Sequence, residues 1–177
     1  MSNIFGFNNI FNYIWLIPIV FSIHELEEWN ILKWYKRYYK NIPESTNTSI
    51  RIHIITFCVL SFILTTIAFL MRNTFVLSLI VAFVSAFIYF NVIQHIIWTV
   101  QLKAYSVGLL TGIVSIIIVA YVNYSFIVNN LINSVFYIIF ILTVIPIIKT
   151  FKVNGEMSPE IKKVHEFFIR IEKQIRK

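Results

Sequence analysis

Long apolar stretches separated by short polar segments run through most of the 177-residue sequence. Runs of this length are typical of membrane-spanning helices, because a helix rises 1.5 Å per residue and the hydrocarbon core of a bilayer is about 30 Å thick. They predict five transmembrane helices, over residues 11–29, 52–70, 75–102, 107–122 and 131–148. We therefore expect an all-α bundle, with residues 1–148 as its transmembrane domain.

The positions of lysine and arginine predict how this bundle is oriented. No cation precedes the first helix, whereas the polar segment after it carries Lys33, Lys36, Arg37, Lys40 and Arg51. With the N-terminus outside, all fifteen lysines and arginines except Arg72 face the cytoplasm, as the positive-inside rule requires. The sequence thus predicts a multi-pass protein of the cell membrane, with the N-terminus out and the C-terminus in.

The C-terminal segment, residues 149–177, is predicted to be a cytoplasmic tail. Apolar residues recur there every three or four positions, as on one face of a helix: Ile161, Val164, Phe167, Phe168, Ile171 and Ile175. Lysine and arginine occupy the opposite face, which predicts a basic amphipathic helix on the cytoplasmic surface of the membrane. His165 falls outside the apolar stripe, and we expect water to solvate it.

Composition agrees with a membrane protein and excludes most soluble classes. Hydrophobic residues make up 58% of the chain and charged residues 13%, against about 25% charged residues in soluble domains. The formal net charge of +7 comes from cations at helix ends and in the tail, so membrane lipids are the expected partner and nucleic acid is not. The sequence is also compatible with a homo-oligomer.

The first helix ends in an unusual polar motif, His24-Glu25-Leu26-Glu27-Glu28. Placing one charged side chain at the bilayer centre costs roughly 2.5–3.5 kcal/mol, so such residues face a cavity, pair with neighbours or hold an ion. At about 100° per residue, His24, Glu27 and Glu28 share one helical face, while Glu25 points about 100° away from His24. This motif is therefore the first candidate for a functional site.

A second polar stripe lies on the third helix and follows helical spacing: Asn91, Gln94, His95 and Trp98. The first and third helices run in the same direction in the predicted topology, so their depths can be compared. His24 lies nine residues before Lys33. His95 lies eight residues before Lys103, which places the two histidines at nearly equal depth. The fourth helix adds weaker candidates at this depth: Ser106, Gly108 and Thr111.

Imidazole nitrogen and carboxylate oxygen are ligands for Zn²⁺ and Fe²⁺. We expect His24, Glu28 and His95 to hold one such divalent metal, with Glu27 beside it as general base. The residues expected to contact the substrate or support the ligands are Asn91, Glu25, Gln94, Trp98 and Tyr105. The pattern favours a metal-dependent membrane enzyme acting on a lipid or another apolar substrate, with hydrolase, isomerase and oxidoreductase activities all open.

Two other classes use the same residues. A small proton- or cation-coupled transporter could relay protons through carboxylates and histidines, but the chain is short and shows no inverted repeat. A structural or immunity-type membrane protein could use a buried polar network to lock its helices together. Polar contacts between membrane helices contribute only about 0.6 kcal/mol on average. Such a small gain in stability argues against a purely structural role for three glutamates within five residues.

The motif and its companions resemble the HXXEE-motif membrane proteins, a family without an assigned function. The resemblance rests on His24-x-x-Glu27-Glu28, on Asn91-x-x-x-His95 and on Tyr105-Ser106-Val107-Gly108-Leu109, and it covers roughly residues 10–148. Val107 stands where the family often has proline before the glycine. The resemblance implies that the histidines, the two motif glutamates and Asn91 act together, but it names no reaction.

Overall fold

The computed structural model describes residues 10–139, 142, 156–157 and 159–177. Helices account for nearly all of these residues, and no strand occurs among them, which confirms the all-α class. The elements are η1 (Ile10–Trp15), α1 (Leu16–Glu27), η2 (Glu28–Asn30), α2 (Leu32–Tyr38), α3 (Asn47–Met71), α4 (Thr74–Leu102), α5 (Leu109–Val128) and α7 (Pro159–Ile175).

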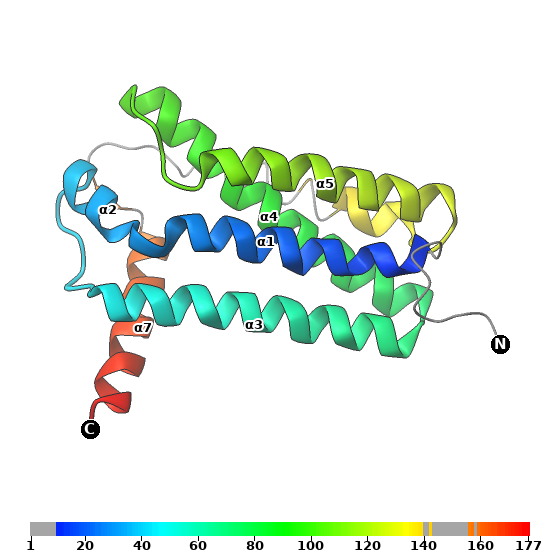
Figure 1. Ribbon diagram of the computed structural model, residues 1–177, viewed down its shortest axis with the longest axis horizontal. Coiled ribbons are helices and arrows are strands. Elements are labelled where there is room, and N and C mark those ends of the chain that lie inside the picture. Colours follow the sequence, from blue (N-terminus) through cyan, green and yellow to red (C-terminus); the bar gives the residue numbers. More distant parts are fainter. Residues whose placement is uncertain (1–9, 140–141, 143–155, 158) are drawn as a thin grey trace.

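Four long helices, α1, α3, α4 and α5, lie side by side in an up-and-down bundle (Figure 1). Helix α1 packs against α3 and α5, and α4 packs against the same two helices from the other side. Consecutive helices alternate in direction, so α1 and α4 run parallel, as expected. Helices α1 and α4 end at one end of the bundle, and α3 and α5 begin there. The short helix α2 and the charged helix α7 lie at the same end (Figure 1), which we therefore call the polar end.

All four long helices meet the length and apolarity of a membrane span: Ile10–Asn30, Asn47–Met71, Thr74–Leu102 and Leu109–Val128. The described chain thus offers four candidate spans, not the five expected. Within the expected fifth span, residues 131–133 are not helical, whereas residues 134–139 and 142 are. Residues 140–141 and 143–148 of that span lie outside the described residues.

Local capping decides where two of the helices begin. Thr46 and Ser49 form a capping box: the Ser49 amide donates to Thr46 Oγ1 at 3.0 Å, and the Thr46 amide donates to Ser49 Oγ at 3.0 Å. This box starts α3 at Asn47, earlier than the expected residue 52, because it satisfies donors that the first turn leaves free. Asn73 caps α4 in the same way, accepting from the Phe75 amide at 2.9 Å.

Two apolar clusters hold the bundle together. One runs along its length and includes the fully buried Ile17, Phe21 and Val122. The other lies at the polar end, where Trp34 of α2 stacks near Trp98 of α4 with ring centroids 5.0 Å apart. Burying each large apolar side chain contributes about 1.5–3 kcal/mol. The polar motif of α1 lies between these two clusters and is thereby shielded on both sides.

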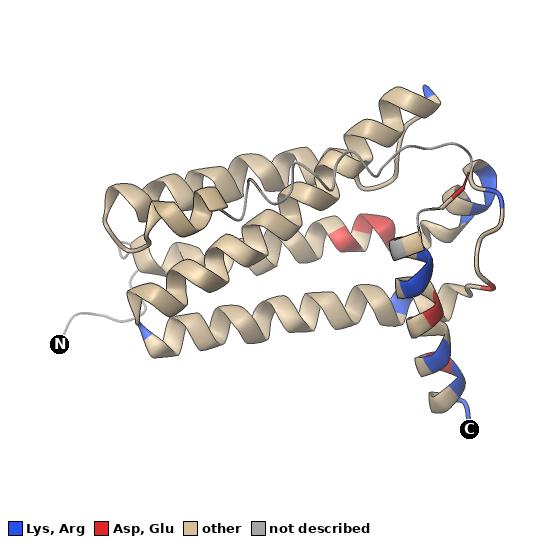
Figure 2. Ribbon diagram, turned by 180° about the vertical axis from the view of Figure 1, so that it is seen from behind, with Lys and Arg blue, Asp and Glu red and all other residues tan. Residues whose placement is uncertain are grey.

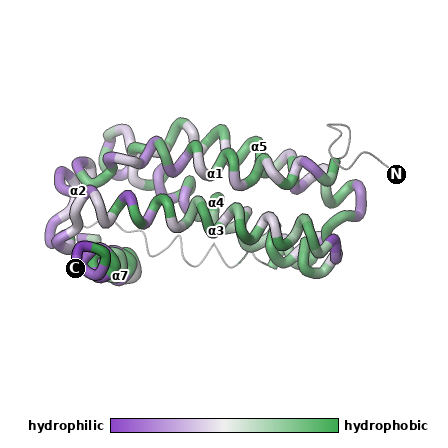
Figure 3. The backbone as a smooth tube through the Cα atoms, turned by 60° about the horizontal axis from the view of Figure 1, so that its bottom comes forward, coloured by the Kyte–Doolittle hydropathy of each residue, from purple (hydrophilic) through white to green (hydrophobic). Residues whose placement is uncertain are grey.

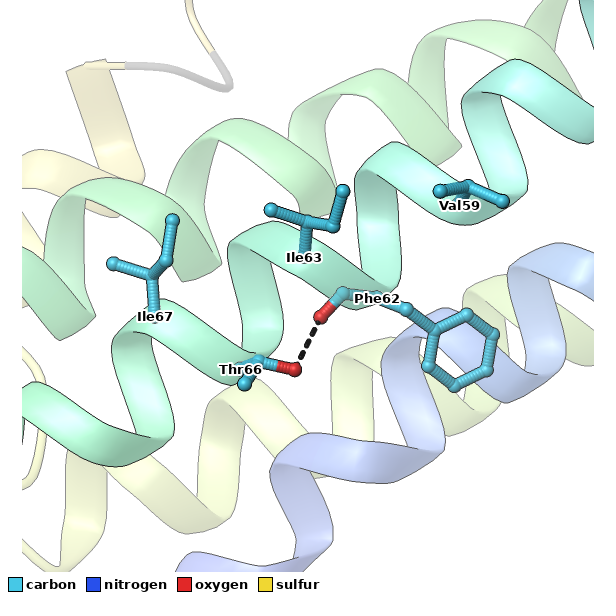
Figure 4. Close-up of a pocket in the computed structure, with 5 residues that line it drawn as sticks. All are labelled: Val59, Phe62, Ile63, Thr66 and Ile67. Atoms are coloured by element: carbon cyan, nitrogen blue, oxygen red, sulfur yellow. Dashed lines mark hydrogen bonds between the residues drawn. The ribbon is translucent and has the colours of Figure 1, made fainter.

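Hydrophobic residues predominate along the middle of the bundle, and hydrophilic residues are frequent in α2 and α7 (Figure 3). On α3, Val59, Phe62, Ile63 and Ile67 line a shallow outer groove with Thr66 (Figure 4). The Thr66 hydroxyl donates to the Phe62 carbonyl at 2.8 Å, so this groove presents no unpaired hydroxyl. A surface of this kind suits contact with lipid chains, where a free polar group would be costly.

Lysine and arginine gather at the polar end of the described chain (Figure 2), with Arg72 following α3 at the opposite end. Helix α7 is part of this basic region and packs against α3. The expectation that water solvates His165 is wrong: this side chain is 4% exposed, and its Nδ1 lies 2.8 Å from Ser45 Oγ. Helix α7 docks on the bundle through Phe168 of the expected apolar stripe together with the polar His165 and Glu172, which the periodicity of apolar residues did not mark.

Candidate metal centre

Three predicted ligands come together between α1 and α4. His24 and Glu28 stand one turn apart at the end of α1, and His95 projects from the parallel helix α4. Glu28 Oε1 lies 3.3 Å from His24 Nε2 and 2.8 Å from His95 Nε2. The ligand atoms of all three residues lie within 4.8 Å of one another, a group that could hold a metal ion.

The centre is buried and contains unsatisfied atoms. His24 and His95 are 0% exposed and Glu28 is 7% exposed. Among the described residues, neither His24 Nε2 nor Glu28 Oε1 makes a well-aligned hydrogen bond, so their polar contacts are the ion-pair distances given above. Leaving a buried polar atom without a well-formed hydrogen bond costs up to about 1–3 kcal/mol, and more when the group is charged. One cation bound between these atoms would satisfy both at once.

The outward-facing ring nitrogens of the two histidines are held by hydroxyl groups. His95 Nδ1 lies 2.9 Å from Ser106 Oγ, and His24 Nδ1 lies 3.4 Å from Thr111 Oγ1. A histidine that donates its Nδ1 proton keeps a lone pair on Nε2, and outer contacts of this kind fix the tautomer of metal-binding histidines. The start of α5 therefore supports both imidazoles, although sequence reasoning ranked Ser106 and Thr111 only as weak candidates.

Gly108 allows the start of α5 to lie close to the ligands. It stands at the N-cap of α5 with a φ of 97°, in the left-handed region that side chains disfavour. A Cβ at this position would lie 2.9 Å from Glu28 Oε1 and 3.0 Å from His95 Cε1. Both the backbone conformation and the missing side chain thus allow α5 to approach the ligands.

Asn91 and Glu25 extend the polar network behind His95. Asn91 Oδ1 lies 3.2 Å from His95 Nε2, and Asn91 Nδ2 donates to Glu25 Oε1 at 3.1 Å. Glu25 is 6% exposed, and no lysine or arginine in the described chain forms an ion pair with it or with Glu28. Two buried carboxylates need protons or a cation to offset the cost of desolvation. This observation also favours a cation at the centre.

Glu27 lies apart from the three ligands. Its carboxylate accepts hydrogen bonds from the Thr111 amide at 3.0 Å, from Thr111 Oγ1 at 2.5 Å and from the Tyr105 hydroxyl. Glu27 therefore caps the start of α5, which Gly108 has no side chain to do. The role of Glu27 as general base stays a prediction, to which the structure adds a capping contact.

The other candidates differ in their distance from the ligands. Trp98 is 2% exposed and packs edge-on against the His95 ring, with centroids 5.3 Å apart, so it walls the centre. Tyr105 is largely exposed and reaches the site only through Glu27. Gln94 is buried, but within the described chain it donates no hydrogen bond to the three ligands. His53 lies elsewhere, stacked on Phe168.

Fold and site together define an all-helical protein with four candidate membrane-spanning helices and a buried His/Glu group able to hold a metal. The chain belongs to the family described as "protein of unknown function with HXXEE motif", whose model matches residues 15–124. That match covers α1 through most of α5 and therefore includes every residue of the centre. No curated protein and no solved structure matches the chain.

Proposed function

We propose that this protein is a metal-dependent membrane enzyme, in which His24, Glu28 and His95 bind one divalent ion, Zn²⁺ or Fe²⁺. The observation that carries the proposal is the convergence of two imidazole Nε2 atoms on one carboxylate oxygen in a buried site. Bonds of about 2.0–2.2 Å in a tetrahedral zinc site place neighbouring ligand atoms roughly 3.3 Å apart. The separations of 3.3 and 2.8 Å come close to that value, so binding requires little rearrangement.

The number of ligands favours catalysis over a structural role. Structural zinc sites have four protein ligands, whereas catalytic sites have three and leave a position open. A divalent ion at such a site polarises oxygen atoms of a substrate and makes bound water more acidic. We propose Glu27 as the group that accepts the proton, because its carboxylate reaches His24 through a single hydroxyl, that of Thr111.

The surroundings of the centre suggest the class of substrate. The ligands stand near the ends of two candidate membrane spans, and apolar side chains enclose them. A lipid or another apolar molecule could approach laterally between helices, while water would enter from the polar end. We further propose that the polar end faces the cytoplasm and that the first described residues lie on the outer side. The gathering of lysine and arginine at the polar end supports this orientation (Figure 2).

Metal content of the detergent-purified protein tests the proposal. We expect about one zinc or iron per chain, lost in His24→Ala and in His95→Ala but retained in Glu27→Gln. His53→Ala is the matched control, because it removes a half-buried histidine at the same end of the bundle that lies outside the centre. Wild-type protein that stays metal-free after incubation with Zn²⁺ and Fe²⁺ would exclude a metalloenzyme.

One observation favours a second candidate, a proton- or cation-coupled transporter. Glu25, Asn91 and His95 form a continuous polar chain that reaches Glu28, and such chains relay protons in membrane proteins. For this function the purified protein would hold no tight metal. Reconstituted vesicles would instead show a change in internal pH that disappears in Glu28→Gln. A structural or immunity-type protein would keep its biological effect in both glutamate variants.

A further inference from the structure

Polar contacts fix helix α7 against the beginning of α3. Glu172 Oε2 accepts from Thr46 Oγ1 at 2.6 Å, and His165 Nδ1 lies 2.8 Å from Ser45 Oγ. The Phe168 ring stacks on His53 of α3, with centroids 4.6 Å apart. These contacts determine which face of α7 meets the bundle and which face turns outward.

The docked helix leaves a second apolar stripe uncovered. Phe167 is 57% exposed and Ile175 is 69% exposed, and Val164 lies on the same side of α7. The neighbouring positions are basic: Lys163, Arg170 and Lys173 are exposed, and Lys162 is half-buried. Glu166 is exposed on the same helix, and Glu172 is buried and paired with Arg176 at 2.6 Å. An apolar stripe beside an excess of positive charge suits a membrane surface that carries anionic lipid.

A groove of about 340 Å³ lies where α7 meets α3, within the usual size range of ligand pockets. We call it the α3–α7 groove; its lining residues are Thr56, Phe57, Lys163, Val164, Phe167 and Phe168. Lys163 is the charged residue among them. The Thr56 hydroxyl donates to the Ile52 carbonyl at 2.7 Å, so the wall that α3 contributes is effectively apolar.

The groove lies well inside the candidate membrane span of α3. Thr56 follows the first residue of α3 by nine positions, or about 14 Å along the helix axis. With the start of α3 at headgroup level, the groove would lie where a lipid headgroup meets its acyl chains. An acyl chain could fill the apolar part, with the phosphate close to the ammonium group of Lys163.

We propose that the α3–α7 groove binds an anionic phospholipid, with an acyl chain against Phe57 and Phe167 and the headgroup phosphate on Lys163. The excess of cations around the groove favours an anionic over a zwitterionic headgroup. This site is separate from the metal centre and does not depend on the function proposed for it. Bound lipid would hold α7 in place at the membrane surface.

Native mass spectrometry of the full-length protein in detergent tests this proposal, with phosphatidylglycerol and phosphatidylcholine titrated separately. We expect phosphatidylglycerol to bind several-fold more tightly. Lys163→Gln should weaken that binding about fivefold, equivalent to the ~1 kcal/mol that one cation contributes near an anionic surface. Lys177→Gln is the matched control, because it removes the same charge from the segment just after α7, away from the groove, and it should leave binding unchanged.

A second pair of variants tests the apolar part of the groove. Phe167→Ser should weaken binding of phosphatidylglycerol, whereas Ile117→Ser, at an exposed apolar position on α5, should not. Equal binding of the two lipids would overturn the proposal, as would equal losses in Lys163→Gln and Lys177→Gln. A dimer that dissociates in Phe167→Ser, with no lipid bound to the wild type, would assign the groove to a second copy of the chain instead.

Discussion

Replacing Gly108 by alanine should weaken metal binding at the centre and destabilise the bundle. The residue begins α5 with a φ of 97°, a conformation that costs an L-amino acid about 1–2 kcal/mol. The new methyl group would also lie 2.9 Å from Glu28 Oε1 and 3.0 Å from His95 Cε1. Ordinary contacts of a Cβ begin at 3.4 Å, so the ligand oxygen must move by about half an ångström.

These two effects give an expected magnitude. Overpacking of this kind typically costs about 1–3 kcal/mol, so with the backbone strain the loss of stability is roughly 2–5 kcal/mol. Displacement of the carboxylate should lower metal affinity by about 10-fold or more, comparable to removing an outer contact of a metal-binding residue. Gly112→Ala serves as a comparison for the backbone strain. Its Cβ would lie 3.0 Å from Val92 and 3.3 Å from His24 Cε1 in a regular helix, without the left-handed strain and without reaching Glu28.

Thermal unfolding in detergent and a competition assay with a chromogenic zinc chelator measure the two quantities. We expect Gly108→Ala to unfold at a lower temperature and to release zinc to a weaker chelator than the wild type does. Gly112→Ala should lose less stability and less metal affinity than Gly108→Ala, because its backbone is helical and its Cβ does not reach the Glu28 oxygen. If Gly108→Ala retained both wild-type stability and wild-type affinity, the close approach of α5 to the ligands would be refuted.

Three further predictions concern contacts around the centre and the docking of α7. Thr111→Val should lower metal affinity about 10–100-fold because it removes the hydroxyl that supports His24, whereas Thr111→Ser should keep the wild-type affinity. Equal metal affinities of Thr111→Val and the wild type would contradict the proposed support. Trp98→Ala should reduce the free energy of unfolding by about 3–5 kcal/mol in chemical denaturation, since the side chain is 2% exposed, and a loss under 1 kcal/mol would show that α2 does not cover the centre. Burial, with a smaller effect of nearby His53, lowers the pKa of His165 to about 4 from the usual ~6.5. The unfolded chain therefore takes up the proton first. The hydrogen-exchange protection factors of α7, corrected for the intrinsic exchange rate at each pH, should fall as the pH drops from about 6.5 to 4, with up to ~3 kcal/mol lost; protection factors that stay flat in this range would contradict a buried neutral imidazole.

Hydrophobic patterning alone determined the helices that build the bundle. An apolar run in a bilayer must satisfy its own backbone hydrogen bonds, so a helix is the simplest structure for it, and four of the expected spans appear with end residues shifted by at most six positions. The i, i+4 spacing paired His24 with Glu28, and equal depth on parallel helices brought in His95. These relations depend on helical geometry, which is local and therefore visible in the sequence.

Tertiary packing decided the contacts that cross between helices. Glu27 shares a helical face with the ligands in projection, yet its carboxylate bonds to the start of α5 because an uncapped helix N-terminus lies there. Ser106, Gly108 and Thr111 support the centre only because α5 packs directly on α1 and α4. His165 is buried because α7 docks through polar partners on the segment before α3. Periodicity tells which residues share a face, but the partner of that face depends on how the helices pack.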